Sequence, residues 1–202
     1  MMKTTNVQFN AIRLGRIETS FAKFTQELSP ANSIISSDGL DIQLISTDSL
    51  RSAFVSPIKY SGKHYLEVEF TNSGSQIVGF TNGSNTIEGE YSDSGSMVLF
   101  GNGNLFINPL SQSASSISKF YPDDGDFYGA PNVVGIAIDF DNETVFWSIN
   151  GDYTNTWSTV DYINQNGAQI TCSRTNSNSS PSFHIRTEDE ALFVPSGYTY
   201  WK

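Results

Sequence analysis

The sequence predicts an all-β fold, an antiparallel β-sandwich that follows a short N-terminal arm. Apolar and polar residues alternate with a period of two along the most persuasive segments, which is typical of half-buried strands. Clusters of Gly, Asn, Asp and Ser separate these segments at intervals of about ten residues, as in sandwiches and barrels. No stretch of a dozen residues carries the apolar stripe of an amphipathic helix. A chain of 202 residues, 38% of them apolar, is long enough for one such domain.

The first 23 residues are predicted to form an arm, and residues 24–202 the sandwich. The arm holds four basic residues and one acid, so its formal charge is +3 while the rest of the chain carries −13. We expect the arm to attach the domain to a neighbouring protein, through apolar packing and pairing with that neighbour's acids. The residues expected to make this attachment are Phe9, Ile12, Arg13, Leu14 and Arg16. The segment 17–28 also admits a short helix.

The clearest strand is His64–Phe70. Its period of two predicts that Leu66 and Val68 face the core, while Tyr65 and Glu67 face water. Further strands are expected where β-branched and aromatic residues gather between turn formers. These are Leu40–Ser46, Leu50–Val55, Gln76–Thr81, Met97–Phe100, Leu105–Asn108, Ala168–Ser173 and Ser182–Arg186.

A hairpin is predicted in the second half of the chain. Val133–Phe140 is apolar on both sides, which is typical of a central strand buried on both faces. Asp141–Glu143 then supplies a tight turn, and Thr144–Ile149 resumes the strand pattern. The second strand ends at Asn150-Gly151, two residues that tolerate positive φ and therefore suit a reversal of the chain.

Few side chains of the kind that catalysis uses are present. Cys172 is the only cysteine, so neither an internal disulfide nor a thiol cluster for a metal can form. The two histidines, His64 and His184, lie in alternating apolar stretches and are expected to be structural. Glu67 and Asp139 are the pair to weigh for glycoside hydrolysis, but carboxylates at strand and turn positions more often serve the fold. We therefore expect no catalytic residue, no metal and no cofactor.

Charge and hydropathy exclude some partners. The net charge is −10, and an acidic body repels phosphate backbones, so nucleic acid is not expected as a ligand. No run of 18 apolar residues predicts a membrane span, and no apolar core follows the N-terminal basic residues as in a signal peptide. Neither membrane insertion nor a secretory signal is expected.

Three segments, in this order, resemble the SPRY domain. They are Tyr60–Val68, which contains Ser-Gly-Lys; the hairpin Val133–Phe140 and Phe146–Gly151, which ends in Asn-Gly; and Phe193–Trp201, with Pro-Ser-Gly before aromatic residues. Ile34–Leu40 is similar to the turn that opens the family's first strand. The resemblance covers residues 24–202 but departs from the family's pattern at residues 111–129 and at the Ala-Pro-Asn that follows.

The resemblance implies a concanavalin-like jelly roll that binds partners through loops at one end of the sandwich and has no catalytic activity. Trp147 and Trp201 are then core residues that bury about 200 Å² each.

Two loops are the candidate ligand sites, because they combine aromatic rings with hydrogen-bond acceptors in the way that sugar and protein sites do. The candidate residues are Tyr121, Asp123, Asp124, Asp126 and Tyr128 in one loop, and Tyr153, Asn155 and Trp157 in the other. The alternative is that their acids only keep the loops solvated. The acidic run falls short of the spacing of a calcium loop, so no metal is assigned to it.

The chain is rich in Ser, Asn, Thr and Gly and poor in lysine, and in this composition it resembles bacteriophage virion proteins. The leading hypothesis is a phage structural or adhesion protein on capsid, baseplate or tail fibre, made in the host cytoplasm and assembled into virions. Its expected partners are other virion proteins through the arm, and a host-surface glycan or protein through the loops, unless it only decorates the particle; a homo-oligomer is admissible. An intracellular SPRY adaptor and a carbohydrate-active enzyme stay open as alternatives.

Overall fold

The computed structural model describes the greater part of the sandwich, with gaps at several loops. The described residues are 21–45, 52–71, 76–83, 95–101, 103–110, 113–117, 132–153, 157–158, 163, 166–174 and 180–202.

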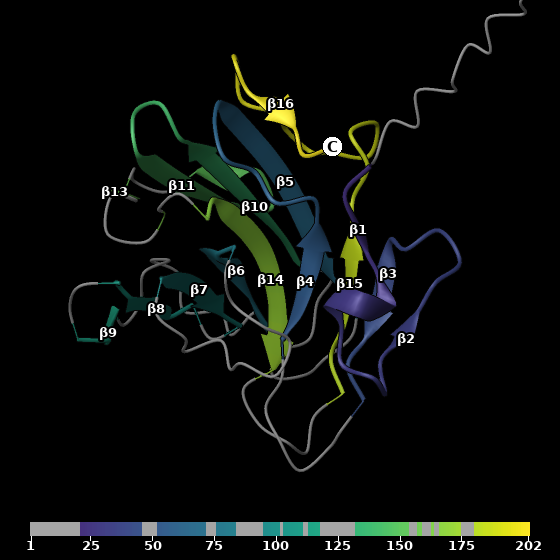
Figure 1. Cartoon of the computed structure of the whole chain (residues 1–202). Helices are drawn as coiled ribbons and strands as arrows, with labels where there is room; N and C mark the ends of the chain where they lie inside the picture. The colour runs from purple at the N-terminus through teal and green to yellow at the C-terminus, as the bar shows by residue number, and fades with distance from the viewer. Residues whose placement is uncertain are drawn as a thin grey trace, which may run out of the picture.

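Two twisted sheets pack face to face (Figure 1). The seven-stranded sheet of the described residues has the order β1 (Lys23–Phe24), β4 (Ala53–Ser56), β14 (Ala168–Arg174), β6 (Gln76–Asn82), β7 (Ser96–Phe100), β8 (Leu105–Asn108) and β9 (Ser115–Ile117). The nine-stranded sheet has the order β12 (Asp152–Tyr153), β11 (Thr144–Ile149), β10 (Asn132–Asp139), β5 (Lys63–Phe70), β15 (Ser182–Ile185), β3 (Asp41–Gln43) and β2 (Ile34–Ile35). In that sheet β13 (Trp157–Ser158) also pairs with β11, and β16 (Thr199–Tyr200) pairs in parallel with β5.

Every strand predicted from the sequence is present, and the antiparallel sandwich is confirmed. Of the segment 17–28, which admitted a short helix, residues 21–28 are described, and they contain one 3-10 turn, η1 (Gln26–Leu28). The described part of the chain has no helix with the length and apolar character that a membrane crossing needs.

The core lies between the two sheets. Trp147 of β11 is fully buried and stacks on Phe80 of β6, with ring centroids 6.4 Å apart, so one pair of rings joins the two layers. Trp201 is also buried, and its indole N–H donates to the carbonyl oxygen of Pro57 at 2.7 Å. Both tryptophans are therefore core residues, as predicted.

The central hairpin forms as the sequence predicts, with β10 between β5 and β11. Ile136 faces Trp147 in its register, and β10 is buried along almost its whole length. Glu143 and Asn150 have φ values of 53° and 52°, the left-handed conformation that turn residues adopt. The Asn150 side chain also accepts a hydrogen bond from the Val133 N–H at 2.9 Å, which closes the hairpin end.

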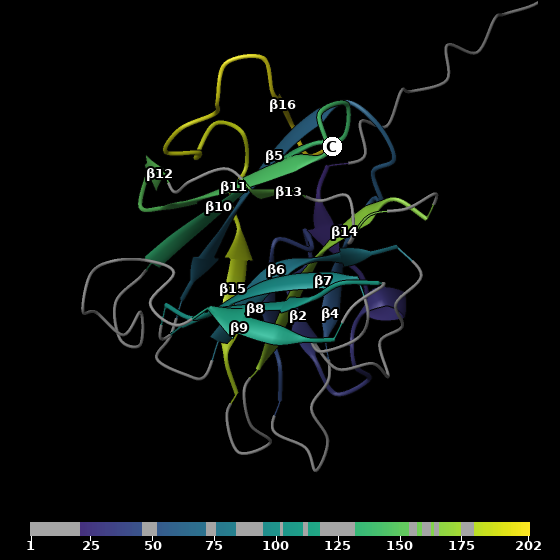
Figure 2. The same cartoon turned by 90° about the vertical axis from the view of Figure 1, so that its left-hand side faces the viewer.

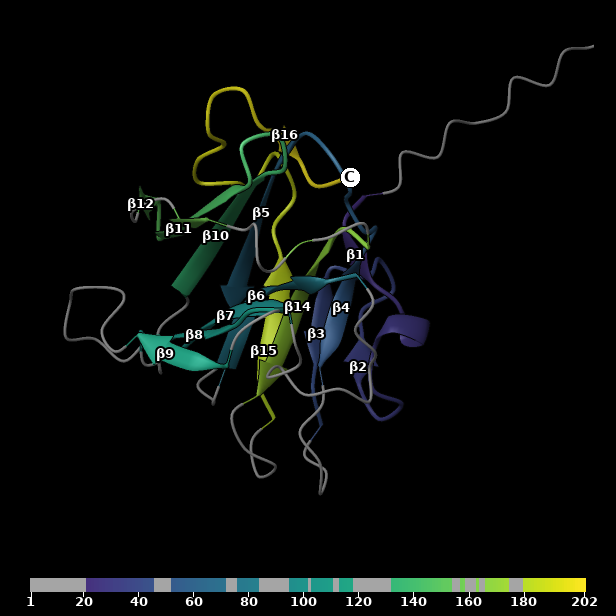
Figure 3. The same cartoon turned by 60° about the vertical axis from the view of Figure 1, so that its left-hand side comes forward.

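One prediction about β5 is wrong. Tyr65 and Glu67 were expected to face water, but both are buried, at 0% and 1% exposed. The cause is a third layer that the strand pattern does not reveal: residues 186–202, called here the C-terminal cover, arch over the outer face of the nine-stranded sheet. Figures 2 and 3 show this yellow segment above the ends of β5 and β10.

Candidate functional site

The ligand residues predicted from the sequence lie largely outside the described residues. This holds for Tyr121, Asp123, Asp124, Asp126 and Tyr128, for Asn155, and for the arm residues Phe9, Ile12, Arg13, Leu14 and Arg16. The backbones of Tyr153 and Trp157 are described, in β12 and β13 beside β11, but their side chains are not. All of these assignments stay predictions, as does the boundary between arm and domain.

A buried carboxylate holds the C-terminal cover in place. The Leu192 N–H donates to Glu67 Oε2 at 2.9 Å, and the Phe193 N–H donates to Glu67 Oε1 at 3.1 Å. The Tyr65 hydroxyl donates to Oε1 at 2.8 Å, and Arg186 Nε lies 3.4 Å from Oε2. Both oxygens of a side chain that is 1% exposed are thus used, which is the condition for burying a charge without a large penalty.

A tyrosine bridges the same region. The Tyr200 hydroxyl accepts a hydrogen bond from the Glu67 backbone N–H at 3.2 Å and donates one to the Arg186 carbonyl oxygen at 2.5 Å. Burial raises the pKa of Tyr200 well above its ordinary value, so this hydroxyl keeps its proton throughout the physiological range. The cover is therefore held on β5 by three side chains: Glu67 of β5, Arg186 directly after β15, and Tyr200 of β16.

The cover presents two apolar side chains to solvent. Leu192 is 50% exposed and Phe193 is 48% exposed, although their backbone N–H groups are bound to a buried carboxylate. We call this pair the platform. Since its backbone is already fixed, a partner that covers the platform would not have to order it first, and that lowers the entropic cost of binding.

The turn beside the platform is acidic and tightly bonded. Glu190 Oε2 accepts hydrogen bonds from the backbone N–H and the hydroxyl of Thr187, at 2.7 and 2.9 Å, and these bonds hold the pKa of Glu190 below its usual value. His184 connects this turn to β3, since its Nδ1 lies 2.9 Å from an Asp41 oxygen and its Nε2 lies 3.6 Å from Glu190. His184 thus has a structural place, as predicted.

Asp139 stabilises the turn of the central hairpin, at the end of β10. Although burial raises its pKa, bonds from Lys63 and Asn142 outweigh that effect and leave the pKa lower than normal. Lys63 Nζ lies 2.7 Å from Oδ2, the Asn142 side chain donates to Oδ2 at 2.7 Å, and the N–H groups of Asp141 and Asn142 donate to Oδ1. Asp139 is therefore a turn residue whose charged form the fold stabilises.

We expect Asp139→Asn to lower the free energy of unfolding at pH 7 by about 1–2 kcal/mol, because charge-assisted bonds are replaced by neutral ones. The lowered pKa means that the folded state binds the proton less readily than the unfolded chain does. The wild type's advantage is present above the unfolded value of about 4 and is lost as pH falls through the lower folded value. Urea unfolding at pH 7 and pH 3 measures this; an equal difference at both pH values would contradict it.

Glu67 and Asp139 do not form a hydrolytic pair. In the β5–β10 register, Glu67 faces Gly135, four residues along β10 from Asp139, so the two carboxylates are separated by about 13 Å of strand. Glycosidase carboxylates lie roughly 5–10 Å apart. Both carboxylates are also saturated with protein hydrogen bonds.

The remaining reactive groups are Cys172 and His64, of which the first is fully buried and the second half-buried. Cys172 is fully buried on β14, and burial raises the pKa of its thiol far above the normal value, so it is not an activated nucleophile. Burial lowers the pKa of His64, whose Nε2 lies 2.9 Å from the Ser61 carbonyl oxygen and whose ring packs edge-on against Trp201. Within the described ranges, no three His, Cys, Asp or Glu side chains gather as metal ligands do.

Known structures share this arrangement of sheets. The SPRY domain of human HERC1 superposes with a TM-score of 0.63 at 11% sequence identity, over 83% of this chain and 99% of that domain. The chain has the SPRY fold. The PSpry domain of TRIM65 superposes with a TM-score of 0.60 at 12% identity, over 84% of this chain and 90% of that domain. Stonustoxin superposes with a TM-score of 0.59 at 14% identity, over 82% of this chain and 28% of the stonustoxin chain.

The likeness to SPRY domains is one of fold, because identity is low and no protein-family model or curated protein matches the sequence. Residues of the motifs that resemble the family serve the fold of this chain: Lys63 pairs with Asp139, and Trp147 fills the core. Sequence reasoning missed the platform. The available signal was Leu192-Phe193 itself, two large apolar residues that follow the acidic run 188–190 after a single alanine.

Proposed function

We propose that this chain is a non-catalytic binding module, which contacts a partner protein through a surface that includes the platform. The observation that carries the proposal is the fixing of an exposed apolar pair, Leu192 and Phe193, by the buried carboxylate of Glu67. A few well-packed side chains near the centre of a contact supply most of the binding energy in protein interfaces. The SPRY neighbours support a protein-interaction role, and the geometry of the two carboxylates gives no support to hydrolysis.

The finer proposal is that the module belongs to a bacteriophage virion, on capsid, baseplate or tail fibre. Its support is the composition of the sequence, together with a basic arm on an acidic body. In this setting the arm attaches the domain to other virion proteins. The platform and the loops then contact a host-surface protein or glycan, or the domain decorates the particle.

A second candidate is an intracellular adaptor. The domains of HERC1 and TRIM65 that share this fold favour it as strongly as composition favours the virion. The two settings differ in where the chain is found, so one experiment separates them.

The test compares the wild type with the double variant Leu192→Asp/Phe193→Asp, each expressed from the native gene locus. Particles are purified from lysates and analysed by mass spectrometry, and intact cells are cross-linked in parallel. Two buried charges in a contact should weaken binding by at least about thirtyfold, equal to roughly 2 kcal/mol. In the virion setting the wild type is present in particles; in the adaptor setting a defined cellular protein is cross-linked to the platform instead.

The matched control is Ile34→Asp, which changes a side chain that is 61% exposed on the edge strand β2. Both variants should melt at a temperature close to that of the wild type, as followed by circular dichroism, since about half or more of each of the three side chains is exposed. A double variant that is cross-linked to its partner as well as the wild type would remove the platform from the contact surface. The same particles show whether Tyr121→Ala/Tyr128→Ala weakens attachment, which tests the predicted loop site.

A further inference from the structure

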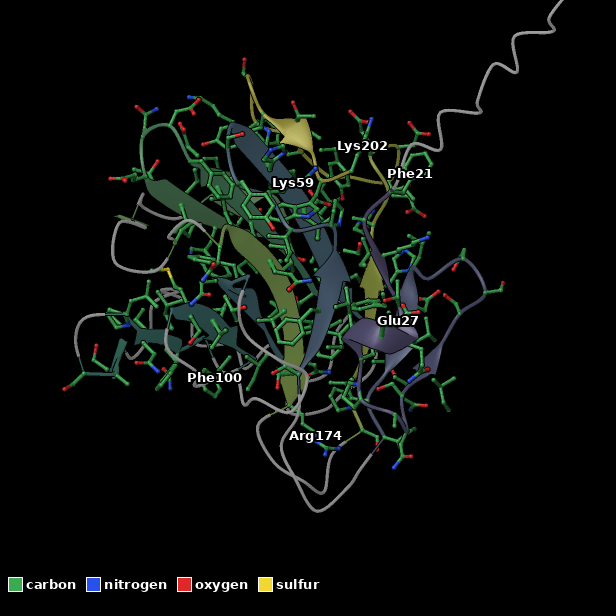
Figure 4. All side chains as sticks on the ribbon, in the orientation of Figure 1. Phe21, Glu27, Lys59, Phe100, Arg174 and Lys202 are labelled. Atoms are coloured by element: carbon green, nitrogen blue, oxygen red, sulfur yellow. The ribbon has the colours of Figure 1, made fainter. Side chains whose placement is uncertain are left out.

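A pocket opens where the start of β1 meets the C-terminal cover. Its volume is about 360 Å³, within the range of protein ligand sites. Its walls are mainly apolar and come from four parts of the chain: Phe21, Leu40, Ile185 and Trp201. Figure 4 shows Phe21 and Lys202, two of its lining residues, on the same side of the molecule.

The pocket has a firm floor and an open wall. Trp201 and Ile185 are both 1% exposed, and the Trp201 indole is hydrogen-bonded to Pro57, so the floor is part of the core. Phe21, in contrast, is 59% exposed. A large exposed ring on the wall of an apolar pocket is surface that an inserted side chain would cover.

The charges at the mouth leave an acidic excess. Both cations in the lining already have partners: Lys202 Nζ lies 2.5 Å from Glu188, and Arg186 Nη1 lies 2.8 Å from Glu69 as well as facing Glu67. Asp189, also in the lining, has no ion pair with any residue that the structure describes.

Asp38 adds to this excess. Its carboxylate accepts hydrogen bonds from the Ser36 hydroxyl and the Leu40 N–H, at 2.6 and 3.1 Å, and no described lysine or arginine pairs with it. The matching ligand is therefore a bulky apolar side chain next to a cation, because an arginine or lysine at the rim would pair with Asp38 or Asp189.

The sequence itself contains a segment of this chemistry. Residues 9–17 carry Phe9, Ile12 and Leu14 interleaved with Arg13 and Arg16, in an arm of charge +3 on a body of charge −13. Opposite charges on the two parts of one molecule attract the arm of one copy to the body of another.

We propose that the pocket binds the arm of a second copy of this chain, with an apolar side chain inserted between Phe21 and Trp201 and an arginine paired with Asp189. The proposal rests on the proposed function only for the expectation that the arm attaches the domain to a neighbour. An arm that fills the pocket of its own copy would leave the chain monomeric, so the state of association separates that case from the exchange of arms between copies. Since the arm and the pocket are different surfaces, two copies can exchange arms reciprocally, or several copies can link head to tail into a ring or a filament.

The test uses two full-length variants with complementary charges. In the first, Arg13→Glu/Arg16→Glu makes the arm acidic; in the second, Asp189→Lys makes the rim basic. Sedimentation velocity is measured for each variant alone and for an equimolar mixture. The wild type should self-associate, each variant alone should associate at least about tenfold more weakly, and the mixture should associate again, because each variant's arm then matches the other's pocket.

Asp152→Lys, the same charge change on an exposed residue of β12, is the matched control and should associate like the wild type. Circular dichroism melting checks that each variant is folded. A wild type that stays monomeric up to about 1 mM overturns the proposal, and so does association that either variant leaves unchanged or that mixing does not restore. The platform variant should associate normally, so failure here and failure of the proposed function are told apart.

Discussion

Glu67→Ala should release the C-terminal cover and lower the free energy of unfolding by about 3–5 kcal/mol, the usual cost of removing one partner from a buried ion pair. The change leaves the N–H groups of Leu192 and Phe193 without their acceptor, and Arg186 without one of its two carboxylates. For a domain of this size the loss corresponds to a melting temperature lower by roughly 10 °C. Hydrogen exchange at the Leu192 and Phe193 amides, with thermal unfolding, measures both effects.

Glu69→Ala is the matched control for this change. Glu69 pairs with the same arginine, but its side chain is 24% exposed, and no backbone N–H of the cover is bonded to it. We expect it to cost at most about 1 kcal/mol, as solvated pairs do, and to leave exchange at the platform unchanged. Equal effects of the two substitutions would show that the ion pairs of Arg186, rather than the hydrogen bonds from Glu67 to the backbone of the cover, stabilise the fold.

Trp147→Ala should cost about 3–5 kcal/mol, because it removes one of the two tryptophans that are fully buried in the described part of the chain and leaves a cavity between the sheets. The loss of stacking on Phe80 separates β11 from β6, so the whole sandwich is weakened rather than one loop. Guanidinium unfolding followed by far-ultraviolet circular dichroism measures the free energy.

The neighbouring residue supplies the control for Trp147. Phe146 lies on the opposite face of β11 and packs against Tyr198 of the cover, with ring centroids 5.4 Å apart. Since it is only half-buried, Phe146→Ala should cost clearly less than Trp147→Ala. A cost under about 1 kcal/mol for Trp147→Ala would mean that the two sheets do not depend on this contact.

The strands and the central hairpin were predictable from the sequence because their causes are local. A period of two marks which side of a strand is apolar, and Asn150-Gly151 marks a reversal because few other residues adopt positive φ. Each of these features is decided by residues that are neighbours in the chain or across one turn. The burial of Trp147 was expected from the resemblance to the SPRY domain, and the structure confirms it.

The burial of Glu67 could not be predicted from the local pattern of β5. Its alternation with Leu66 and Val68 correctly predicts that it faces away from the inner core. That it is nevertheless buried depends on the cover, which is more than a hundred residues further along the chain and binds it through Leu192, Phe193 and Arg186.

By itself, then, the sequence determined the fold class, the strands, the hairpin turns and the aromatic core, since side-chain chemistry and backbone propensity act over a few residues. Only the tertiary structure decided which segment covers the outer sheet face, that Leu192 and Phe193 remain exposed on it, and that Phe21, Asp189 and Trp201 share one pocket. The physical reason is that exposure and proximity are properties of packing between distant segments, which no single segment encodes.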